Sequence, residues 1–367
     1  MSLGHPQNGV KMRGILLFVN LCSQIKCINT EKISNNTCVI HIVYGGVVEM
    51  KRNAHNQKEE QNIKLEISSK SQRAGEGDGR KKRRNDHSWK LVSDSGCSLL
   101  VPDGLDGIDI DYAEVPFVIS VDNTDYIDGP GIDIEKMLEH IANCQSGGRS
   151  SCPSPHAWLE AWGDAENVIA FTLSAALSGS YNSAIAARHM ALEKNPGRNI
   201  AVINTCGAGV FPEQLANIIY EEIGDGDSFD AIVSAADKAV REIQVMFALG
   251  SLDNLIKAGR LNKLVGYAAH RFNISAIGVA SPGGRIELRH KFRGMKKIYG
   301  KLIDTLRETG FAGGELVISH CMNEDGAEKL GHLIKAEWLD ADVSVVPASG
   351  LCSYYMGKGG MIITYHE

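Results

Sequence analysis

The chain has 367 residues, 43% of them hydrophobic and 22% charged, a composition that excludes a collagen-like or fully disordered chain and fits two packed domains. Its longest apolar run, Ile15–Cys22, is interrupted by Asn20 and is far shorter than the ~18 residues that span a bilayer, which excludes stable membrane insertion. Residues 1–88 contain 15 Lys and Arg against 8 Asp and Glu, whereas the remainder contains 23 against 36, and so acidic a body argues against a nucleic-acid partner.

Residues 1–88 differ in composition from the rest of the chain. The segment Asn53–Asp86 is polar, has no sustained apolar period and contains the basic run Arg80–Arg84, which predicts disorder. Lys11–Cys22 faintly resembles a signal peptide but has no small-residue cleavage site. We therefore expect residues 1–88 to be a disordered or appended extension whose basic run is a solvated linker; the alternative is a nuclear signal or a nucleic-acid-binding arm.

From Trp89 onward, strands alternate with helices. The predicted strands are Trp89–Ser93, Val115–Val121, Asn167–Leu173 and Ile200–Ile203, and the predicted helices are Ile134–Ala142, His156–Trp162, Asn182–Leu192, Pro212–Ile223 and Ser228–Gln244. Apolar strands separated by helices are typical of a parallel sheet covered on both faces. The pattern predicts an α/β domain over residues 89–245.

The succession of predicted strands and helices changes after Met246. The predicted strands are Met246–Leu249, Ala276–Val279, Arg285–Arg289, Glu315–Ser319, Asp342–Val346 and Met361–Thr364, and the predicted helices are Leu252–Lys257, Met295–Arg307 and Glu324–Trp338. This mixture indicates a second, α+β domain over residues 246–367. The fold class expected for the whole chain is therefore α/β, with two domains.

The usual signatures of enzymes and of metal sites are missing. The nine cysteines are widely spaced without a Cys-x-x-Cys pair, which favours reduced thiols in a cytoplasmic protein. There is no phosphate-binding P-loop, Gly-x-Gly-x-x-Gly turn, Gly-x-Ser-x-Gly elbow or His-Glu-x-x-His motif, and no two histidines stand at a ligand spacing. We expect no metal, no cofactor and no catalytic residue.

Two loops carry polar groups suited to an anion. Phe171–Ala184 reads as a strand, a small-residue loop containing Ser178 and Gly179, and a helix. Such a loop lies at the carboxyl edge of a parallel sheet, where free backbone amides and a hydroxyl near a helix start can hold an anionic head group. Gly148–Pro155, with Ser150 and Ser151, offers similar groups before the next helix. The serines can equally be simple helix caps.

An ordered set of motifs resembles the DegV family of bacterial fatty-acid-binding proteins. The family pattern is Asp-Ser after the first strand, then Thr-Ser-Gln-Pro-Ser, Leu-Ser-Gly-Thr-Tyr, Leu-x-x-Leu-x-x-Gly-Gly-Arg, Lys-x-Arg and His-x-Gly-Pro-Gly. The corresponding segments here are Asp94-Ser95, Ser150–Ser154, Leu177–Tyr181, Leu252–Arg260, Lys291–Arg293 and Tyr355–Gly359. Each motif alone is weak, but the ordered set is specific and covers about Trp89–Glu367.

The resemblance implies a two-domain protein without catalytic chemistry of its own, which holds one long-chain fatty acid, such as palmitate, stearate or oleate, in an apolar tunnel between the domains. It implies that a partner fatty acid kinase converts the presented carboxylate to an acyl-phosphate. The residues that it assigns to the carboxylate are Ser150, Ser151, Ser178, Gly179 and Tyr355. Arg260 and Arg293 match basic positions suited to contact with the partner or its nucleotide phosphates, or to ordinary salt bridges.

Three of the departures from the family pattern matter most. Cys152 replaces glutamine, Lys358 replaces the proline of the last turn, and Tyr355 replaces histidine. Tyrosine still donates a hydrogen bond but cannot become cationic near neutral pH, so a shifted ligand preference is one reading. Two further functions remain open: a kinase- or transferase-like enzyme acting through Ser178 on a small acid, and a DNA-binding regulator acting through Arg80–Arg84.

Overall fold

The structure, a computed structural model, describes residues 28–33, 37–42, 46–51, 88–101, 110–144, 147–261, 274–293 and 298–366. The chain divides into two compact units, Met1–Arg80 and Lys81–Glu367. In the first unit, strands β1 (Ile28–Ile33), β2 (Thr37–Ile42) and β3 (Gly46–Lys51) pair antiparallel in that order. The segment Asn53–Asp86 that was expected to be disordered lies outside the described residues, as does its basic run.

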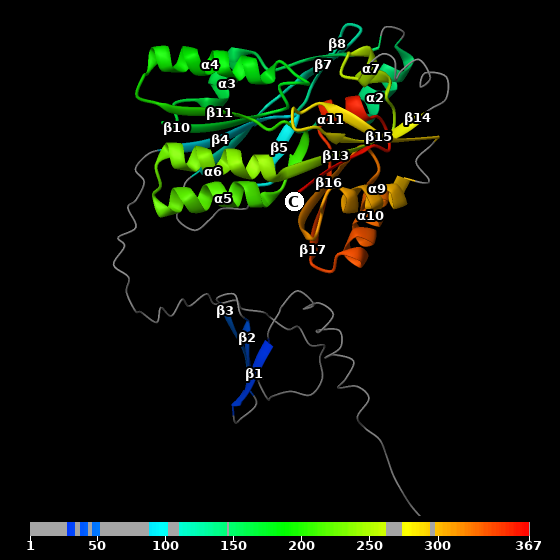
Figure 1. The fold of residues 1–367 in the computed structure, drawn as a ribbon. Helices are drawn as coiled ribbons and strands as arrows, with labels where there is room; N and C mark the ends of the chain where they lie inside the picture. Colours follow the sequence, from blue (N-terminus) through cyan, green and yellow to red (C-terminus); the bar gives the residue numbers. More distant parts are fainter. Residues whose placement is uncertain are drawn as a thin grey trace, which may run out of the picture. The chain divides into compact units, whose positions relative to one another are not determined.

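The second unit begins with a parallel four-stranded sheet. Its strands are β4 (Trp89–Asp94), β6 (Ile110–Val115), β10 (Asn167–Thr172) and β11 (Asn199–Asn204), in the order β11-β10-β4-β6. Every residue of β10 is buried, as expected for a strand covered on both faces. The helices α3 (Pro155–Trp162) and α4 (Ser180–Lys194) cover one face, and α5 (Glu213–Asp225) and α6 (Phe229–Glu242) cover the other (Figure 1). The predicted α/β domain is confirmed.

The second sheet has six strands and mixed pairing. It consists of β13 (Ile243–Leu249), β14 (Ile274–Ala280), β15 (Ile286–Arg293), β16 (Gly314–His320), β17 (Ala341–Pro347) and β18 (Met361–His366), in the order β15-β14-β13-β18-β16-β17. Only β16 and β17 pair in parallel among these strands. The helices α9 (Ile298–Glu308) and α10 (Glu324–Glu337) pack on one face, so the predicted α+β character is confirmed.

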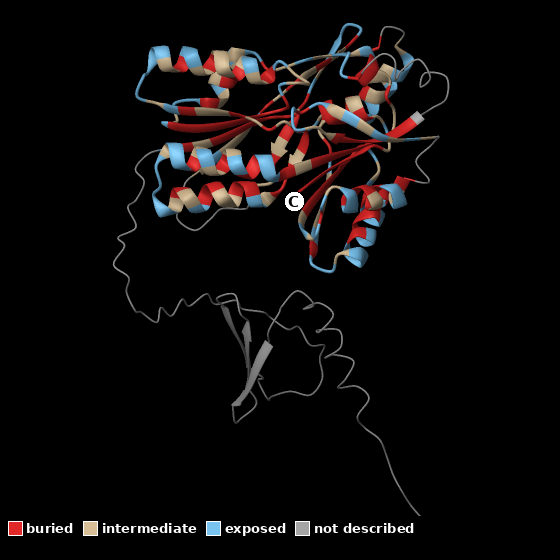
Figure 2. Cartoon of the chain, viewed as in Figure 1, coloured by how far each residue is buried: buried red, intermediate tan, exposed pale blue. Residues whose placement is uncertain are grey.

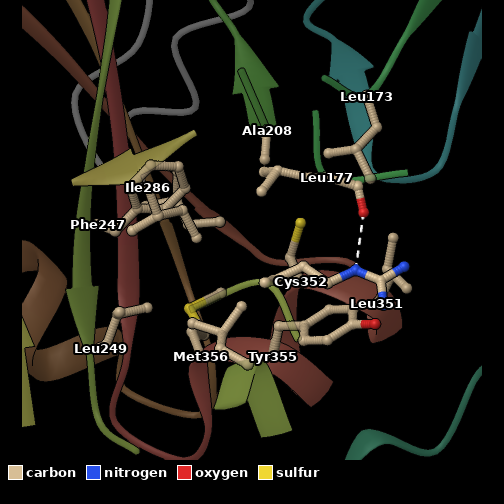
Figure 3. A pocket seen from close by; sticks show the side chains of 13 residues that line it. Leu173, Leu177, Ala208, Phe247, Leu249, Ile286, Leu351, Cys352, Tyr355 and Met356 are labelled. Carbon is tan, nitrogen blue, oxygen red and sulfur yellow. Dashed lines mark hydrogen bonds between the residues drawn. The ribbon is translucent and has the colours of Figure 1, made fainter. Parts of the chain in front are cut away.

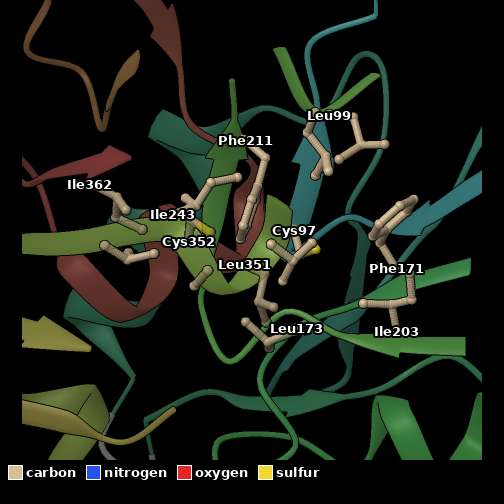
Figure 4. Packing of buried hydrophobic residues seen from close by; sticks show 14 of the residues in the cluster. Cys97, Leu99, Phe171, Leu173, Ile203, Phe211, Ile243, Leu351, Cys352 and Ile362 are labelled. Carbon is tan, nitrogen blue, oxygen red and sulfur yellow. The ribbon is translucent and has the colours of Figure 1, made fainter. Parts of the chain in front are cut away.

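Successive side chains of β13 point to opposite faces of the sheet and pack in two different cores. Met246 and Ala248 face the core beneath α9 and α10, whereas Val245, Phe247 and Leu249 face a second core. That second core is continuous with the underside of the parallel sheet, so that Phe171, Ile203, Phe211, Ile243 and Ile362 belong to one apolar cluster (Figure 4). The buried strands of both sheets run toward this shared cluster (Figure 2).

A small subdomain completes the unit. It contains β7 (Val118–Val121), β8 (Thr124–Ile127) and β9 (Arg149–Ser151) in the order β8-β7-β9, together with α2 (Ile134–Asn143). Against it packs a short helix from near the end of the chain, α11 (Gly350–Met356). The remaining described elements are the paired strands β5 (Cys97–Leu99) and β12 (Gly209–Phe211) and the short helix α7 (Asp253–Lys257).

Three predicted boundaries differ from the structure for local reasons. The single strand predicted over Val115–Val121 is two strands, because Pro116 between them has no N–H for a ladder. The helix predicted to reach Gln244 ends at Glu242, and the last two residues enter β13. The expected domain boundary between residues 245 and 246 therefore falls inside β13. The domain limits stay a prediction.

Candidate functional site

All five residues predicted to bind a ligand line one pocket. This mouth pocket has a volume of about 320 Å³, and its lining comprises Phe117, Ser150, Ser151, Cys152, Leu173, Leu177, Ser178, Gly179, Arg260, Leu351 and Tyr355. The hydroxyl-bearing residues come from β9, from the loop that follows β10, and from α11. Segments up to 205 residues apart in sequence thus meet at one polar opening.

An apolar pocket lies directly behind the mouth. The two pockets share Leu173, Leu177, Arg260, Leu351 and Tyr355 in their linings. The other residues of the apolar pocket are Ala208, Phe247, Leu249, Leu255, Ile286, Cys352, Met356 and Ile362. Tyr355 stands at one end, and Phe247 and Leu249 lie across the pocket from it (Figure 3). The volume of about 50 Å³ suffices for water-sized occupants only, so an extended acyl chain would have to displace lining side chains.

The first polar wall is the loop between β10 and α4. Ser178 Oγ accepts a hydrogen bond from the backbone N–H of Ser180 at 3.2 Å, which is the cap-like arrangement considered from the sequence. Because only the oxygen is used in this bond, the hydroxyl proton stays available to donate into the pocket. Gly179, at the start of α4, is exposed. The loop therefore combines a hydroxyl with a helix N-terminus, where an anion is favoured.

The second polar wall is β9, facing α11. Ser150 pairs with Ile119 of β7, and its hydroxyl lies 2.8 Å from the hydroxyl of Tyr355. The neighbouring Tyr354 donates a hydrogen bond to the carbonyl of Gly148 at 2.6 Å. The rings of Tyr354 and Tyr355 meet edge to face with centroids 4.7 Å apart. Two tyrosines thus attach α11 to β9 and its preceding loop.

A buried carboxylate holds the start of α11. Asp128 accepts hydrogen bonds from the backbone N–H groups of Gly350 at 2.5 Å and Leu351 at 3.0 Å, and from the hydroxyl of Ser95 at 2.7 Å. Burial raises the pKa of Asp128 above its usual value. These contacts fix the helix that carries Tyr355, and their position could not be foreseen from the isolated Asp94-Ser95 turn.

The other acid of this region, Asp94, lies beneath the first wall. Its carboxylate accepts hydrogen bonds from the backbone N–H groups of Leu173 at 2.9 Å and Gly96 at 3.1 Å. Complete burial raises the pKa of Asp94 to about 7, although these donors and the hydroxyl of Ser180 act in the opposite direction. From the sequence, Asp94 was only part of a turn, because burial depends on segments far away in the chain.

Of the two arginines predicted to contact a partner, Arg260 has a described side chain at the pockets. Arg260 lines both pockets, and it donates hydrogen bonds to the carbonyls of Leu177 at 2.9 Å and Ala258 at 2.5 Å. No ion pair of Arg260 with another described residue is found. Arg293 is the last residue of β15, paired with Ile274, and its side chain lies outside the described part of the structure.

The other two departures from the family pattern are Cys152, at the mouth, and Lys358, in an exposed contact. Cys152 lines the mouth, and its partial burial raises the pKa of its thiol. Lys358 lies 3.9 Å from Glu135 of α2, in an exposed contact that contributes little to stability. Over the ranges that the structure describes, no cluster of His, Cys, Asp and Glu could hold a metal ion. No helix in those ranges is long and apolar enough to cross a membrane.

The sequence matches one family model over most of its length. Residues 88–367 match the model described as "Uncharacterised protein, DegV family". A DegV domain-containing protein of Streptococcus gordonii is 37% identical over 278 residues, which cover 76% of this chain and 99% of that protein. The resemblance seen in the motifs is thereby confirmed.

Two similar solved structures contain fatty acids. The Fatty Acid Kinase (Fak) B3 protein of Streptococcus pneumoniae, loaded with linoleic acid, is 34% identical with a TM-score of 0.70. A DegV family protein from Eubacterium eligens, loaded with heptadecanoic acid, is 37% identical with a TM-score of 0.68. Each match covers 76% of this chain and 99% of the other. These structures confirm the predicted fold class.

Proposed function

Since the chain belongs to the DegV family, we propose that residues 88–367 hold one long-chain fatty acid, with the carboxylate at the mouth pocket and the acyl chain in the apolar pocket behind it. A single observation carries this proposal: hydroxyls from three distant segments surround an opening, and the pocket behind it is lined mostly by apolar side chains. The fatty acids present in the two similar solved structures support the same ligand class.

The division of labour between the two pockets is physically reasonable. Burying about fifteen methylenes at ~0.8 kcal/mol each gives on the order of 12 kcal/mol of gross driving force, much of which is offset by ordering the chain. The apolar pocket therefore supplies affinity. The hydroxyls of Ser150, Ser178 and Tyr355, with the exposed Ser151 and the backbone at Gly179, orient the head group. The small volume of the apolar pocket implies that lining side chains, including the flexible Met356, move to admit the chain.

The proposed ligand is presented to a partner fatty acid kinase. The name of the S. pneumoniae relative connects it with such a kinase. A carboxylate held by neutral hydroxyls keeps more of its nucleophilicity than one held in a close ion pair, and Arg260, which already donates to two carbonyls, stands at the rim. We propose that Arg260 and Arg293 face the partner. We also propose that the protein works in the cytoplasm, which suits the free thiols of Cys97, Cys152, Cys206, Cys321 and Cys352.

The enzyme alternative receives no support from the site. A nucleophilic Ser178 needs an adjacent base, and none of the described residues lining the mouth is a histidine, an aspartate, a glutamate or a lysine. The two similar solved structures are loaded with fatty acids, which supports a binding protein. The DNA-binding alternative depends on Arg80–Arg84, which lie outside the described residues.

The proposal is tested by purifying the chain, extracting it with organic solvent and identifying fatty acids by mass spectrometry. We expect about one long-chain fatty acid per protein molecule and uptake of added palmitate or oleate. The variant Ala208→Phe, which fills the apolar pocket, should abolish both, whereas Glu160→Phe at an exposed position of α3 should not. Absence of any fatty acid together with no uptake would refute the proposal.

A further inference from the structure

The carboxylate of Asp94 is an uncompensated acid next to the proposed head-group site. It is fully buried, and its hydrogen-bond donors are the neutral backbone N–H groups of Leu173 and Gly96. Leu173 itself lines both the mouth and the apolar pocket. A charge held only by neutral donors in a buried position is costly, so this acid is sensitive to any second negative charge placed nearby.

Among the described residues, no cation acts on the pKa of Asp94, and the cation that lines the mouth is Arg260. Asp128 acts on Asp94 as a like charge and raises its pKa further. The thiols of Cys97, Cys352 and Cys152 all respond to the charge of Asp94, which raises the pKa of each one. Cys152 lines the mouth, so the field of Asp94 reaches the place where a ligand carboxylate would lie.

A protonated Asp94 also has a hydrogen-bond acceptor nearby. Ser180, the first residue of α4, lies beside it and influences its pKa. The hydroxyl of Ser180 is buried with no partner other than Asp94 among the described residues, and toward the ionised carboxylate it acts as a donor that lowers the pKa of Asp94. The same hydroxyl oxygen can accept a hydrogen bond from a protonated carboxyl. Ionised and neutral forms of Asp94 are thus both structurally accommodated at the base of the loop Leu173–Ser180.

We propose that Asp94 takes up a proton when an anionic head group occupies the mouth, so that ligand binding and release are linked to pH through this buried carboxyl. The inference rests on the proposed function of the site. Mutual repulsion between two carboxylates in a low-dielectric site favours protonation of one of them. By linkage, the uptake of a proton on binding means that affinity for the anion declines as pH rises.

The direction and range of the effect follow from the ionisation of Asp94. Where Asp94 is already neutral, below about pH 7, binding takes up little and affinity is nearly independent of pH. Above that range, the anion either binds beside the ionised carboxylate of Asp94 or binds only after Asp94 has taken up a proton. We expect the affinity for palmitate to fall by roughly 3- to 10-fold between pH 6.5 and pH 8.5. Release would be favoured on the alkaline side.

The experiment measures binding of radiolabelled palmitate and of hexadecanol by equilibrium dialysis of the full chain from pH 6.0 to pH 9.0. Palmitate is ionised throughout, since an unperturbed carboxyl has a pKa near 4, whereas the alcohol carries no charge. Proton uptake is measured by calorimetry in two buffers of different ionisation enthalpy. Palmitate should show the fall in affinity and an average uptake of about one quarter to one half of a proton between pH 6.5 and pH 8.5, and hexadecanol should show neither.

The variant Asp94→Asn should bind palmitate with no fall above pH 7 and no proton uptake, whereas Asp237→Asn, which removes an exposed aspartate paired with Arg241, should behave like the unaltered chain. Equal pH dependence for palmitate and hexadecanol, or uptake that persists in Asp94→Asn, would overturn the proposal. If Asp94→Asn does not fold, carbon-13 NMR titration of labelled aspartates in the unaltered chain gives the same answer: a pKa that does not rise on loading with palmitate contradicts it. Absence of palmitate binding at every pH would instead refute the proposed function.

Discussion

The hydroxyl groups of Ser150 and Tyr355 lie 2.8 Å apart, so the residue that replaces the family histidine hydrogen-bonds to the residue that replaces the family threonine. Either oxygen can be the donor, and one hydroxyl proton remains free to bind a ligand. The pair keeps a neutral hydrogen-bonding wall at the mouth without an imidazole. A tyrosine here is therefore compatible with recognition of a carboxylate, as the following variants can establish.

Removing either hydroxyl should weaken binding of a fatty acid. We expect Tyr355→Phe and Ser150→Ala each to lower palmitate affinity by about 5- to 20-fold, equivalent to about 1–2 kcal/mol for a lost hydrogen bond to a charged group. Because the two hydroxyls contact each other, the double variant should lose less than the sum. Equilibrium binding measures this, with Tyr126→Phe, which loses a hydroxyl bonded to His140, as the control. Unchanged affinity in both single variants would contradict the assignment.

Ser178 should show two separable roles. Its hydroxyl accepts from the N–H of Ser180, so Ser178→Ala should lower the free energy of unfolding by roughly 1 kcal/mol, as loss of a cap does. If the proton also binds the ligand, palmitate affinity should fall about 10-fold as well. Ser154→Ala, which removes the cap of α3, is the matched control that loses stability alone. Equal affinities of the two variants would reduce Ser178 to a cap.

Arg260 should support the head-group loop besides any contact with a partner. Its guanidinium donates to the carbonyl of Leu177, and so Arg260→Ala should lower palmitate affinity several-fold by loosening the loop. Arg260→Lys retains the charge but loses the planar arrangement of donors, and should be impaired almost as much. Arg289→Ala, an exposed arginine beside Glu287, is the control. If Arg260→Ala binds normally and fails only when a kinase is present, the role of Arg260 is confined to the partner.

Stability should depend on pH through Asp94. Its pKa is about 7 in the folded chain against 3.8 for an ordinary aspartate, so the protonated form is favoured by folding. This contribution is fully present below the unfolded pKa and is lost as pH rises to about 7. Asp94→Asn lacks it, so the variant should gain on the order of 2 kcal/mol relative to the unaltered chain between pH 5 and pH 8. Urea unfolding at both pH values measures the difference, and a constant difference would contradict the raised pKa.

The sequence was sufficient for the elements with strong periodicity. The buried strand β10 and the helices α2, α5 and α10 were predicted because apolar spacing marks them. The DegV motifs led to five residues that line the mouth pocket, and their role as ligand contacts stays a prediction. The strands β9 and β12, with three residues each, are too short to show a period. They exist because partner strands complete their hydrogen bonds. The helix α11 could not be predicted from the sequence, because its start depends on hydrogen bonds to Asp128, more than 200 residues earlier.

The ionisation of Asp94 could not be predicted from the sequence for a related reason. An Asp-Ser pair after a strand is typical of an exposed turn, and a turn predicts an ordinary carboxyl. Burial of Asp94 arises from the packing of the β10–α4 loop and α11 over it. The lining of the apolar pocket could not be predicted from the sequence either. Phe247 and Ile362 reach one pocket only because β13 and β18 are neighbours in the sheet.

The anchoring of α11 by Asp128 has a consequence for when the protein can first hold a lipid. Ser150 and the β10 loop leave the ribosome long before Tyr355, so during synthesis the opening lacks an entire side until residues 350–356 emerge and their first amides reach Asp128. A nascent chain stalled anywhere earlier presents hydroxyls without the helix that closes them in. On the proposed function, a fatty acid can therefore be held only by chains whose synthesis has passed α11, and unfinished copies take up no free acyl chains.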